Sequence, residues 1–137
     1  MANPSGDYPR FRGLQMTPFA ILPNSAQGTG NSIPPDVRVA VLGANVNDAN
    51  DFTVLPSLAS VPNGHTITVL AGTAANSELR TPASSNEKIN NQDSDGTKEA
   101  LLTAGNVYTV TKLDNTRGWM LEGRTAIGAY EAAIVPD

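Results

Sequence analysis

The sequence predicts an all-β fold, an antiparallel β-sandwich or jelly roll with an extended N-terminal arm. Short runs rich in β-branched residues recur at intervals of roughly ten residues, as in sandwiches and barrels. Gly, Asn and Pro separate these runs, with 12 Gly and 10 Pro among 137 residues, and no stretch has the periodicity of a long amphipathic helix. These observations divide the chain into an arm, residues 1–35, and a β-sandwich domain, residues 36–137.

The arm combines breakers of regular structure with apolar and basic side chains. Its six prolines and four glycines exclude a helix or a central strand. The arm is net positive, whereas residues 36–137 hold 7 basic and 12 acidic side chains. It either folds back over its own body or docks on a neighbouring protein, where a Pro-fixed extended segment loses little backbone entropy. The candidate residues for docking on a capsid or a neighbouring subunit are Tyr8, Arg10, Phe11, Arg12, Leu14 and Phe19.

The first half of the body contains four predicted strands. In the first, alternation places Val37, Val39 and Val41 on the buried face. In the third, Ile67 and Val69 face the core, and the Asn63-Gly64 pair before it supplies the positive φ of a tight turn. The four predicted strands are 36–42, 52–55, 66–71 and 78–81, with a loop over 43–50.

The second half contains one predicted hairpin and two ambiguous segments. Residues 83–96 form a polar surface loop that Ile89 pins to the core. Residues 98–102 form either one helical turn or a strand, and residues 123–137 form either a helix or an edge strand. Between them, strands 106–113 and 119–122 flank a turn over 114–118. The predicted core residues are Trp119, Val110, Val69 and Val39.

Composition excludes several classes of function. The formal net charge of −4 and the pI near 4.8 disfavour nucleic acid as a partner. The absence of cysteine excludes disulfides and thiolate sites. No apolar run has the length of a membrane span, and the first seven residues lack the pattern of a signal peptide. We therefore expect a soluble protein made in the cytoplasm, with no membrane partner.

No catalytic constellation stands out in the sequence. His65 is the only histidine, and its place after a turn predicts an exposed turn residue. A Ser-His-Asp triad would need a serine brought to His65 by the fold, and no Gly-x-Ser-x-Gly elbow is present. Asp48 and Asp51 are the paired carboxylates considered for glycoside hydrolysis, although two acids in an Asn-rich loop are usually hydrated. We expect no enzymatic activity and no cofactor.

Residues 91–99 resemble the first half of a calcium-binding loop. Oxygen donors at alternate positions are followed by Gly96, which would supply the sharp turn. The twelfth position, where a bidentate Glu is required, is Leu102, and no flanking helices are evident. The pattern therefore favours an Asp-rich turn without metal, and we expect no metal site.

Half of the chain resembles the β-rich modules of tailed-phage virion proteins. The resemblance rests on the order of four loose motifs between residues 52 and 122, which reflect turn chemistry and core spacing. The motifs are Pro62-Asn63-Gly64-His65-Thr66-Ile67-Thr68-Val69, Pro82-Ala83-Ser84 followed by Ile89-Asn90, Leu102-Thr103-Ala104-Gly105, and Gly118-Trp119. Such modules occur in fibre and spike proteins and in head decoration, or cement, proteins. The resemblance implies a β-sandwich or jelly roll, usually trimeric, without enzymatic activity.

Chain length favours the decoration protein within this group. A fibre would carry long repeats or heptads, and the sequence has none. The resemblance implies a homotrimer on the outside of a capsid, with the major capsid protein as partner and the virion as its location. The alternative is a receptor- or carbohydrate-binding tip of a fibre or spike, in which residues 84–95 present polar groups to a glycan. A third possibility is a hydrolase.

Overall fold

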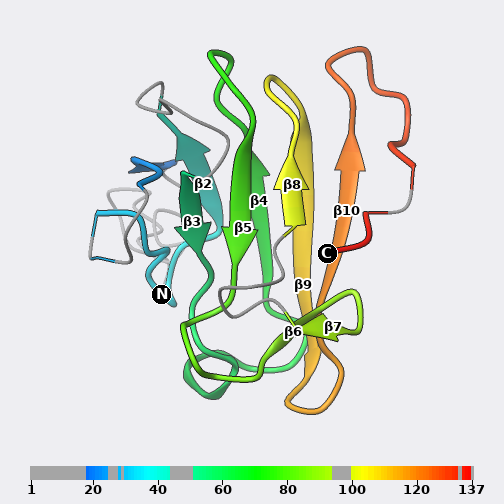
Figure 1. Cartoon of the computed structure of the whole chain (residues 1–137). Coiled ribbons are helices and arrows are strands. Elements are labelled where there is room, and N and C mark those ends of the chain that lie inside the picture. The colour runs from blue at the N-terminus through cyan, green and yellow to red at the C-terminus, as the bar shows by residue number, and fades with distance from the viewer. Residues whose placement is uncertain are drawn as a thin grey trace, which may run out of the picture.

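Two β-sheets make up nearly all the regular structure of the protein (Figure 1). The computed structural model describes residues 18–24, 28, 30–43, 51–93, 100–132 and 134–136. One 3₁₀ helix, η1, covers Leu58–Ser60, and these described residues contain no α-helix. The strands are β1 (Phe19–Ile21), β2 (Val39–Leu42), β3 (Phe52–Val54), β4 (Thr66–Leu70), β5 (Ser77–Arg80), β6 (Lys88–Ile89), β7 (Gln92–Asp93), β8 (Ala100–Leu102), β9 (Val107–Asp114) and β10 (Gly118–Arg124).

Both sheets are mixed. The larger sheet has the order β1-β2-β4-β9-β10-β6-β7, and the smaller has the order β3-β5-β8. Strand β2 is parallel to β1 and β4, β3 is parallel to β5, and β6 is parallel to β10, whereas the other pairs are antiparallel. The predicted all-β class is confirmed, but the predicted antiparallel pairing is wrong. The reason is that β3, on the smaller sheet, lies between β2 and β4 in the chain, so β4 can return parallel to β2.

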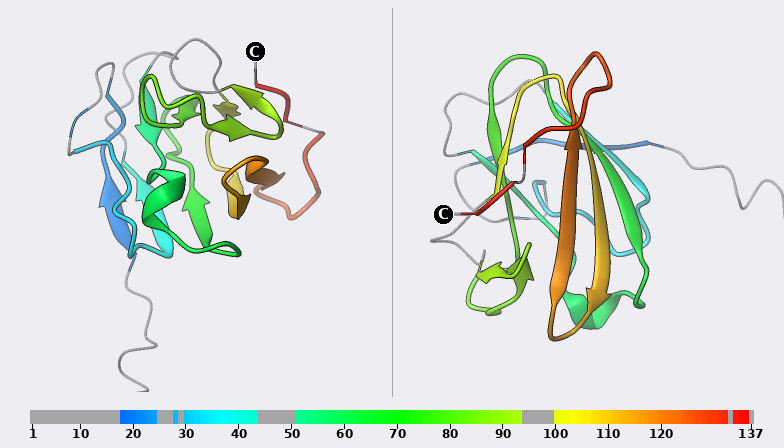
Figure 2. Two further views of the ribbon diagram at one scale, coloured as in Figure 1. Left: turned by 90° about the horizontal axis from the view of Figure 1, so that it is seen from below. Right: turned by 90° about the vertical axis from the view of Figure 1, so that its right-hand side faces the viewer.

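The two sheets form two layers around one core. The smaller sheet lies in front of β4 and β9 in Figure 1, and the side view in Figure 2 separates the layers. Trp119, Val110 and Val69 are fully buried, as the sequence predicts, and so is Tyr108. Ile67 is also fully buried, so the alternation predicted for β4 is confirmed.

The predicted buried face of β2 is wrong. Ala40 and Leu42 are buried, whereas Val39 and Val41 are half-buried on the opposite face, so Val39 is not a core residue. Every position in this strand is apolar, and the pattern therefore cannot distinguish the two faces. The register with β4 decides between them, because Ala40 lies beside the inward-facing Val69.

The predicted loop over residues 83–96 contains a small hairpin. Strands β6 and β7 are joined by Asn90 and Asn91, which both have positive φ, +50° and +66°. Two successive positive φ angles define a type I′ turn, and Asn tolerates them. Ile89 is fully buried, so its predicted role in pinning the loop is confirmed.

The structure assigns the described parts of the two segments that the sequence left ambiguous, residues 98–102 and 123–137. In the first of them, residues 100–102 form β8, so this part is a strand and not a helical turn. After β10, the described residues of the second segment form neither a helix nor an edge strand, and Tyr130 makes only an isolated bridge with Arg124. We call residues 130–135 the C-terminal segment.

Candidate functional site

The structure describes one of the six candidate docking residues. Phe19 lies in β1, the edge strand of the larger sheet, and is 41% exposed. The other five lie outside the described residues. The arm's described part belongs to the body, because β1 pairs with β2, and both Ile21 and Ile33 are buried in the core.

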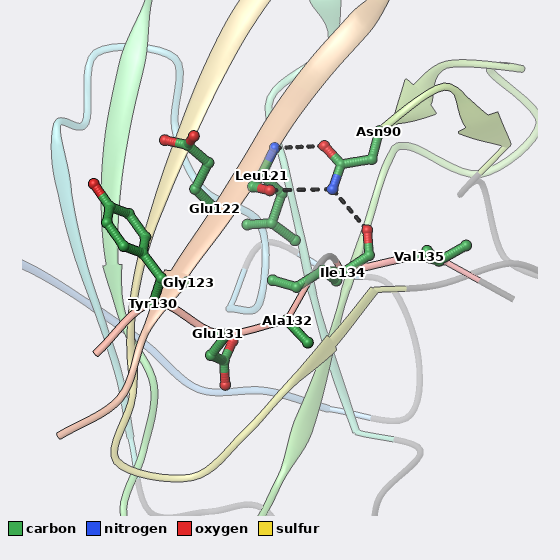
Figure 3. A pocket seen from close by; sticks show the side chains of 9 residues that line it. All are labelled: Asn90, Leu121, Glu122, Gly123, Tyr130, Glu131, Ala132, Ile134 and Val135. Carbon is green, nitrogen blue, oxygen red and sulfur yellow. Dashed lines mark hydrogen bonds between the residues drawn. The ribbon is translucent and has the colours of Figure 1, made fainter. Parts of the chain in front are cut away.

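A cavity of about 410 Å³ lies between β10 and the C-terminal segment (Figure 3). Asn90 stands at one side of it and forms three hydrogen bonds. Its Oδ1 accepts from the Leu121 backbone N–H at 2.8 Å, and its Nδ2 donates to the carbonyls of Leu121 at 3.1 Å and Ile134 at 2.8 Å. The Asn90 amide thus acts as a strand partner for β10 and holds the C-terminal segment against it.

Glu131 anchors the same segment from the other side of the cavity. Its backbone N–H donates to the Gly123 carbonyl at 3.0 Å, and its Oε1 accepts from the Tyr108 hydroxyl at 3.2 Å and from the Asn106 amide. Burial raises the pKa of Tyr108, and the Glu131 carboxylate raises it further. The Tyr108 hydroxyl also accepts from the Thr103 N–H at 2.7 Å. These polar groups are committed to joining the C-terminal segment to the core.

Tyr130 is the aromatic side chain beside the cavity and is 70% exposed. An exposed ring near carboxylates is typical of a carbohydrate site, but the Arg124 guanidinium lies 3.9 Å from the centroid of this ring. That contact occupies one face of the ring. The cavity is therefore built mainly to fasten the C-terminal segment.

The outer face of the larger sheet is an extended uncharged surface. Three adjacent strands, β2, β4 and β9, bring matching residues into rows, such as Val39 beside Thr68 beside Thr109. On the neighbouring β10, charged Glu122 lies beside Thr109 and charged Arg124 lies beside Val107. We define the outer face as Val39, Val41, Thr66, Thr68, Leu70, Val107, Thr109 and Thr111.

The sequence contained a signal for this face. Thr66 and Thr68 alternate with buried residues in β4, as Thr109 and Thr111 do in β9. The threonines meet across the strands, and the hydroxyls of Thr66 and Thr111 lie 3.1 Å apart. The sequence did not show that β4 pairs with β9, and this pairing joins the threonine rows of the two strands into one surface.

His65 is buried, so its prediction as an exposed turn residue is wrong. It is 3% exposed and stands edge-on to Trp119, with ring centroids 6.3 Å apart. Arg38 Nη1 contacts both ring nitrogens and lies 2.8 Å from Nε2. Burial lowers the pKa of His65, and the positive charges of Arg38 and Lys112 lower it further. This environment disfavours a proton on the imidazole beside two cations.

The surroundings of His65 do not resemble a triad. A triad orients its histidine with a carboxylate, whereas the charged neighbours that perturb His65 are Arg38 and Lys112. Of the two carboxylates considered for hydrolysis, Asp48 lies outside the described residues and Asp51 is buried. The described part of the chain holds no group of three His, Cys, Asp or Glu side chains that could bind a metal ion.

Much of the calcium-like pattern lies outside the described residues, which stop at Asp93 and resume at Ala100. Leu102, at its twelfth position, is fully buried in β8. Within the described ranges, no helix is long and apolar enough to cross a membrane.

No protein-family model matches the chain, and no curated protein sequence matches it significantly.

Proposed function

We propose that the protein is a structural virion protein, a trimer of β-sandwich or jelly-roll subunits that binds the outside of a tailed-phage capsid and stabilises it. The observation that carries this proposal is the uncharged outer face of the larger sheet. An uncharged surface spread over three strands suits contact with another protein better than capture of a small ligand, which usually needs a concave pocket. The function needs no turnover and no cofactor, and it is exercised in the virion.

The size of the outer face supports an assembly of several copies. Three strands spaced ~4.8 Å apart, each with about five residues rising ~3.3 Å, give a projected area of roughly 200–250 Å². A standard interface buries about 800 Å² on each partner, so one copy is too small to hold alone. Three copies present roughly 700 Å², and weak contacts then add through avidity.

The arm supplies the remaining contacts in this proposal. Tyr8, Arg10, Phe11, Arg12 and Leu14 precede β1, whose Phe19 is exposed at the sheet edge. Their apolar side chains would bury area at about 25 cal/mol per Å². The arginines would meet acidic groups on the capsid protein or on a neighbouring subunit, since the body of this chain is itself acidic.

One pair of matched variants tests the role of the outer face. Thr68→Lys puts a charge at its centre, whereas Thr116→Lys puts the same charge in the exposed turn between β9 and β10. Binding is measured by co-sedimentation with heads assembled from the capsid protein of the encoding phage. We expect Thr68→Lys to weaken binding at least tenfold and Thr116→Lys to leave it unchanged. Equal binding by both variants would remove the outer face from the function.

The alternative function is a receptor- or carbohydrate-binding tip. It is favoured by the exposed polar turn at Ser84 and Asn86, where both residues have positive φ. Such a turn presents hydroxyl and amide groups away from the body, as glycan recognition requires. Binding of the purified protein on a glycan array, without affinity for heads, would favour this alternative.

A further inference from the structure

Strand β8 leaves one edge of the smaller sheet open. Within the described residues, β5 is the only strand that pairs with it. An open edge presents unpaired N–H and C=O groups that can accept another strand. At the centre of β8, Leu101 is 50% exposed, whereas Ala100 and Leu102 on either side are fully buried.

A groove with both polar and apolar lining lies beside this edge. A cavity of about 480 Å³ separates Leu101 from the C-terminal segment, where Tyr130, Ile134 and Val135 line its other side. Tyr130 and Val135 are each 70% exposed. Exposed apolar side chains on both sides of an open strand edge are the features of a site for an extended peptide, which adds main-chain hydrogen bonds and buries alternate side chains.

Residues 10–17 of this chain have the sequence of such a peptide. They lie between Pro9 and Pro18 and contain no proline, so every residue in the run can donate a ladder hydrogen bond. In an extended strand Leu14 and Met16 lie on one face, together with Arg10 and Arg12, and Phe11 lies on the other. Arg10 and Arg12 would approach a groove that Glu131 lines, and Glu122 lines the neighbouring cavity beside the same C-terminal segment.

The position of β1 argues for a groove on a second copy. Strand β1 and the C-terminal segment lie on opposite sides of the molecule in Figures 1 and 2. Leu14 is only five residues from Phe19, the first residue of β1, and five extended residues reach at most about 17–18 Å. A body of this length has a radius near ~18 Å, so a path around half its circumference takes about 57 Å. Leu14 therefore cannot reach the groove of its own body, whereas the groove of a neighbouring subunit can lie next to β1.

We propose that residues 10–17 of one copy add as a strand to the free edge of β8 in a second copy, with Leu14 and Met16 in the groove beside Leu101. Because β1, which follows the donor segment in the chain, and the acceptor edge lie on opposite sides of each subunit, the contact is head-to-tail. In the proposed trimer this contact closes into a ring. This inference deepens the proposed trimeric assembly and relies on the proposed function only for the number of subunits.

The absence of cysteine allows a direct test by crosslinking. Two single-cysteine proteins, Leu14→Cys and Leu101→Cys, carry tags of different length, so that their products separate by size; they are mixed, oxidised mildly and run on a non-reducing gel. We expect a crosslink between the two proteins. The matched control pairs Leu14→Cys with Asn63→Cys, which lies in the exposed turn before β4, and it should give at least tenfold less product. Equal yields from the two pairs would overturn the proposal.

A second experiment separates this inference from the proposed function. Leu101→Lys should keep the fold, because the side chain is half exposed, and should raise the dissociation constant of the oligomer at least tenfold in sedimentation velocity. An oligomer unchanged by Leu101→Lys would contradict the β8 docking site, whatever the protein binds. Crosslinking between Leu14→Cys and Leu101→Cys without head binding would contradict the capsid function and leave the inference intact.

Discussion

His65 links the turn after η1 to the centre of the core. It follows the Asn63-Gly64 turn, and its ring meets Trp119 from β10 and Arg38 from the segment before β2. Its position could not be predicted from the sequence, because the turn itself is exposed and only the packing of three distant segments covers the ring. The positive φ predicted for this turn is confirmed, since Gly64 has a φ of +81°.

Protonation of His65 should weaken the fold. Its folded-state pKa lies below the ordinary value of 6.5, because burial and the charges of Arg38 and Lys112 oppose a positive ring. The unfolded chain therefore binds more protons just below 6.5, and the free energy of unfolding should fall as the pH drops through this window. Urea unfolding at a series of pH values measures this slope.

A matched variant isolates the histidine. His65→Gln keeps a polar side chain that does not titrate, so its free energy of unfolding should no longer fall between roughly pH 7 and 5. A second fall in the free energy of unfolding, at lower pH, should remain in both proteins, because hydrogen bonds from Arg117 lower the pKa of Asp114 from 3.8 to about 2. The stability that Asp114 contributes is present above pH 3.8 and is lost as the pH falls toward 2. The same slope near pH 6 in both proteins would contradict the role of His65.

Lys112 is a second buried charge with a structural role. It is 4% exposed, and its Nζ donates to the carbonyls of Leu58 at 2.6 Å and Val61 at 2.8 Å. We expect Lys112→Met to destabilise the protein by about 3 kcal/mol, because both carbonyls lose their charged donor. Thermal unfolding measures this loss. Thr111→Met, at the half-exposed neighbouring position, is the control and should change stability by less than about 1 kcal/mol.

At the scale of elements, η1 shows how two distant side chains fix a short helix. The Glu87 carboxylate accepts from the N–H of Leu58, the first residue of η1, at 2.9 Å. The Lys112 ammonium donates to the carbonyls of Leu58 and of Val61, the residue after η1, so the two side chains satisfy backbone groups at both ends of this turn. The Glu87 pKa is raised because burial outweighs the hydrogen bond from Leu58. Sequence alone could not predict η1, since its two caps lie 29 and 54 residues away.

The β6-β7 hairpin depends on Asn90 in two ways. Its backbone occupies the first positive-φ position of the turn, and its side chain joins Leu121 to Ile134. Asn90→Ala should destabilise the protein by about 3 kcal/mol through turn strain and lost hydrogen bonds, and it should speed proteolysis near the C-terminus. Asn91→Ala keeps the hydrogen bonds of the Asn90 side chain and should lower the free energy of unfolding by about 1 kcal/mol through turn strain alone. Equal losses of stability in the two variants, measured by urea unfolding, would show that these hydrogen bonds contribute nothing.

The elements that sequence predicted best are those with one polar and one apolar face. Strands β4 and β9 alternate Thr with buried residues, so both their position and their orientation were predictable. Strand β2 is apolar throughout, and only its position was predictable. The Asn90-Asn91 pair carried a type I′ signal within a stretch that otherwise predicts a loop, because β6 and β7 have two residues each.

At the scale of the molecule, the class of fold was predictable and the pairing was not. Local alternation predicts strands, but parallel pairing of β2 with β4 depends on a connection that crosses to the other sheet. The same long-range pairings create both surfaces proposed for binding. The outer face needs β4 beside β9, and the groove needs the C-terminal segment beside β8.

Removal of the arm should separate assembly from folding. The cut belongs after residue 17, because β1 begins at Phe19 and pairs with β2. Without residues 1–17, we expect a folded monomer whose binding to heads falls at least tenfold, since avidity is lost. Circular dichroism checks that the truncated protein is folded, sedimentation velocity checks that it is a monomer, and co-sedimentation measures its binding to heads. A truncated protein that still forms the full oligomer would place the subunit contact elsewhere.

The most direct measurement of the proposed function is the position of the protein on a phage particle. Heads of the encoding phage, saturated with the purified protein, are imaged by electron cryomicroscopy and compared with heads that received Thr68→Lys. We predict three-lobed density on the outside of the capsid with the unmodified protein and little or none with the variant. Bare capsids, with the protein found at fibre or spike tips, would contradict the capsid function and support the receptor-binding alternative.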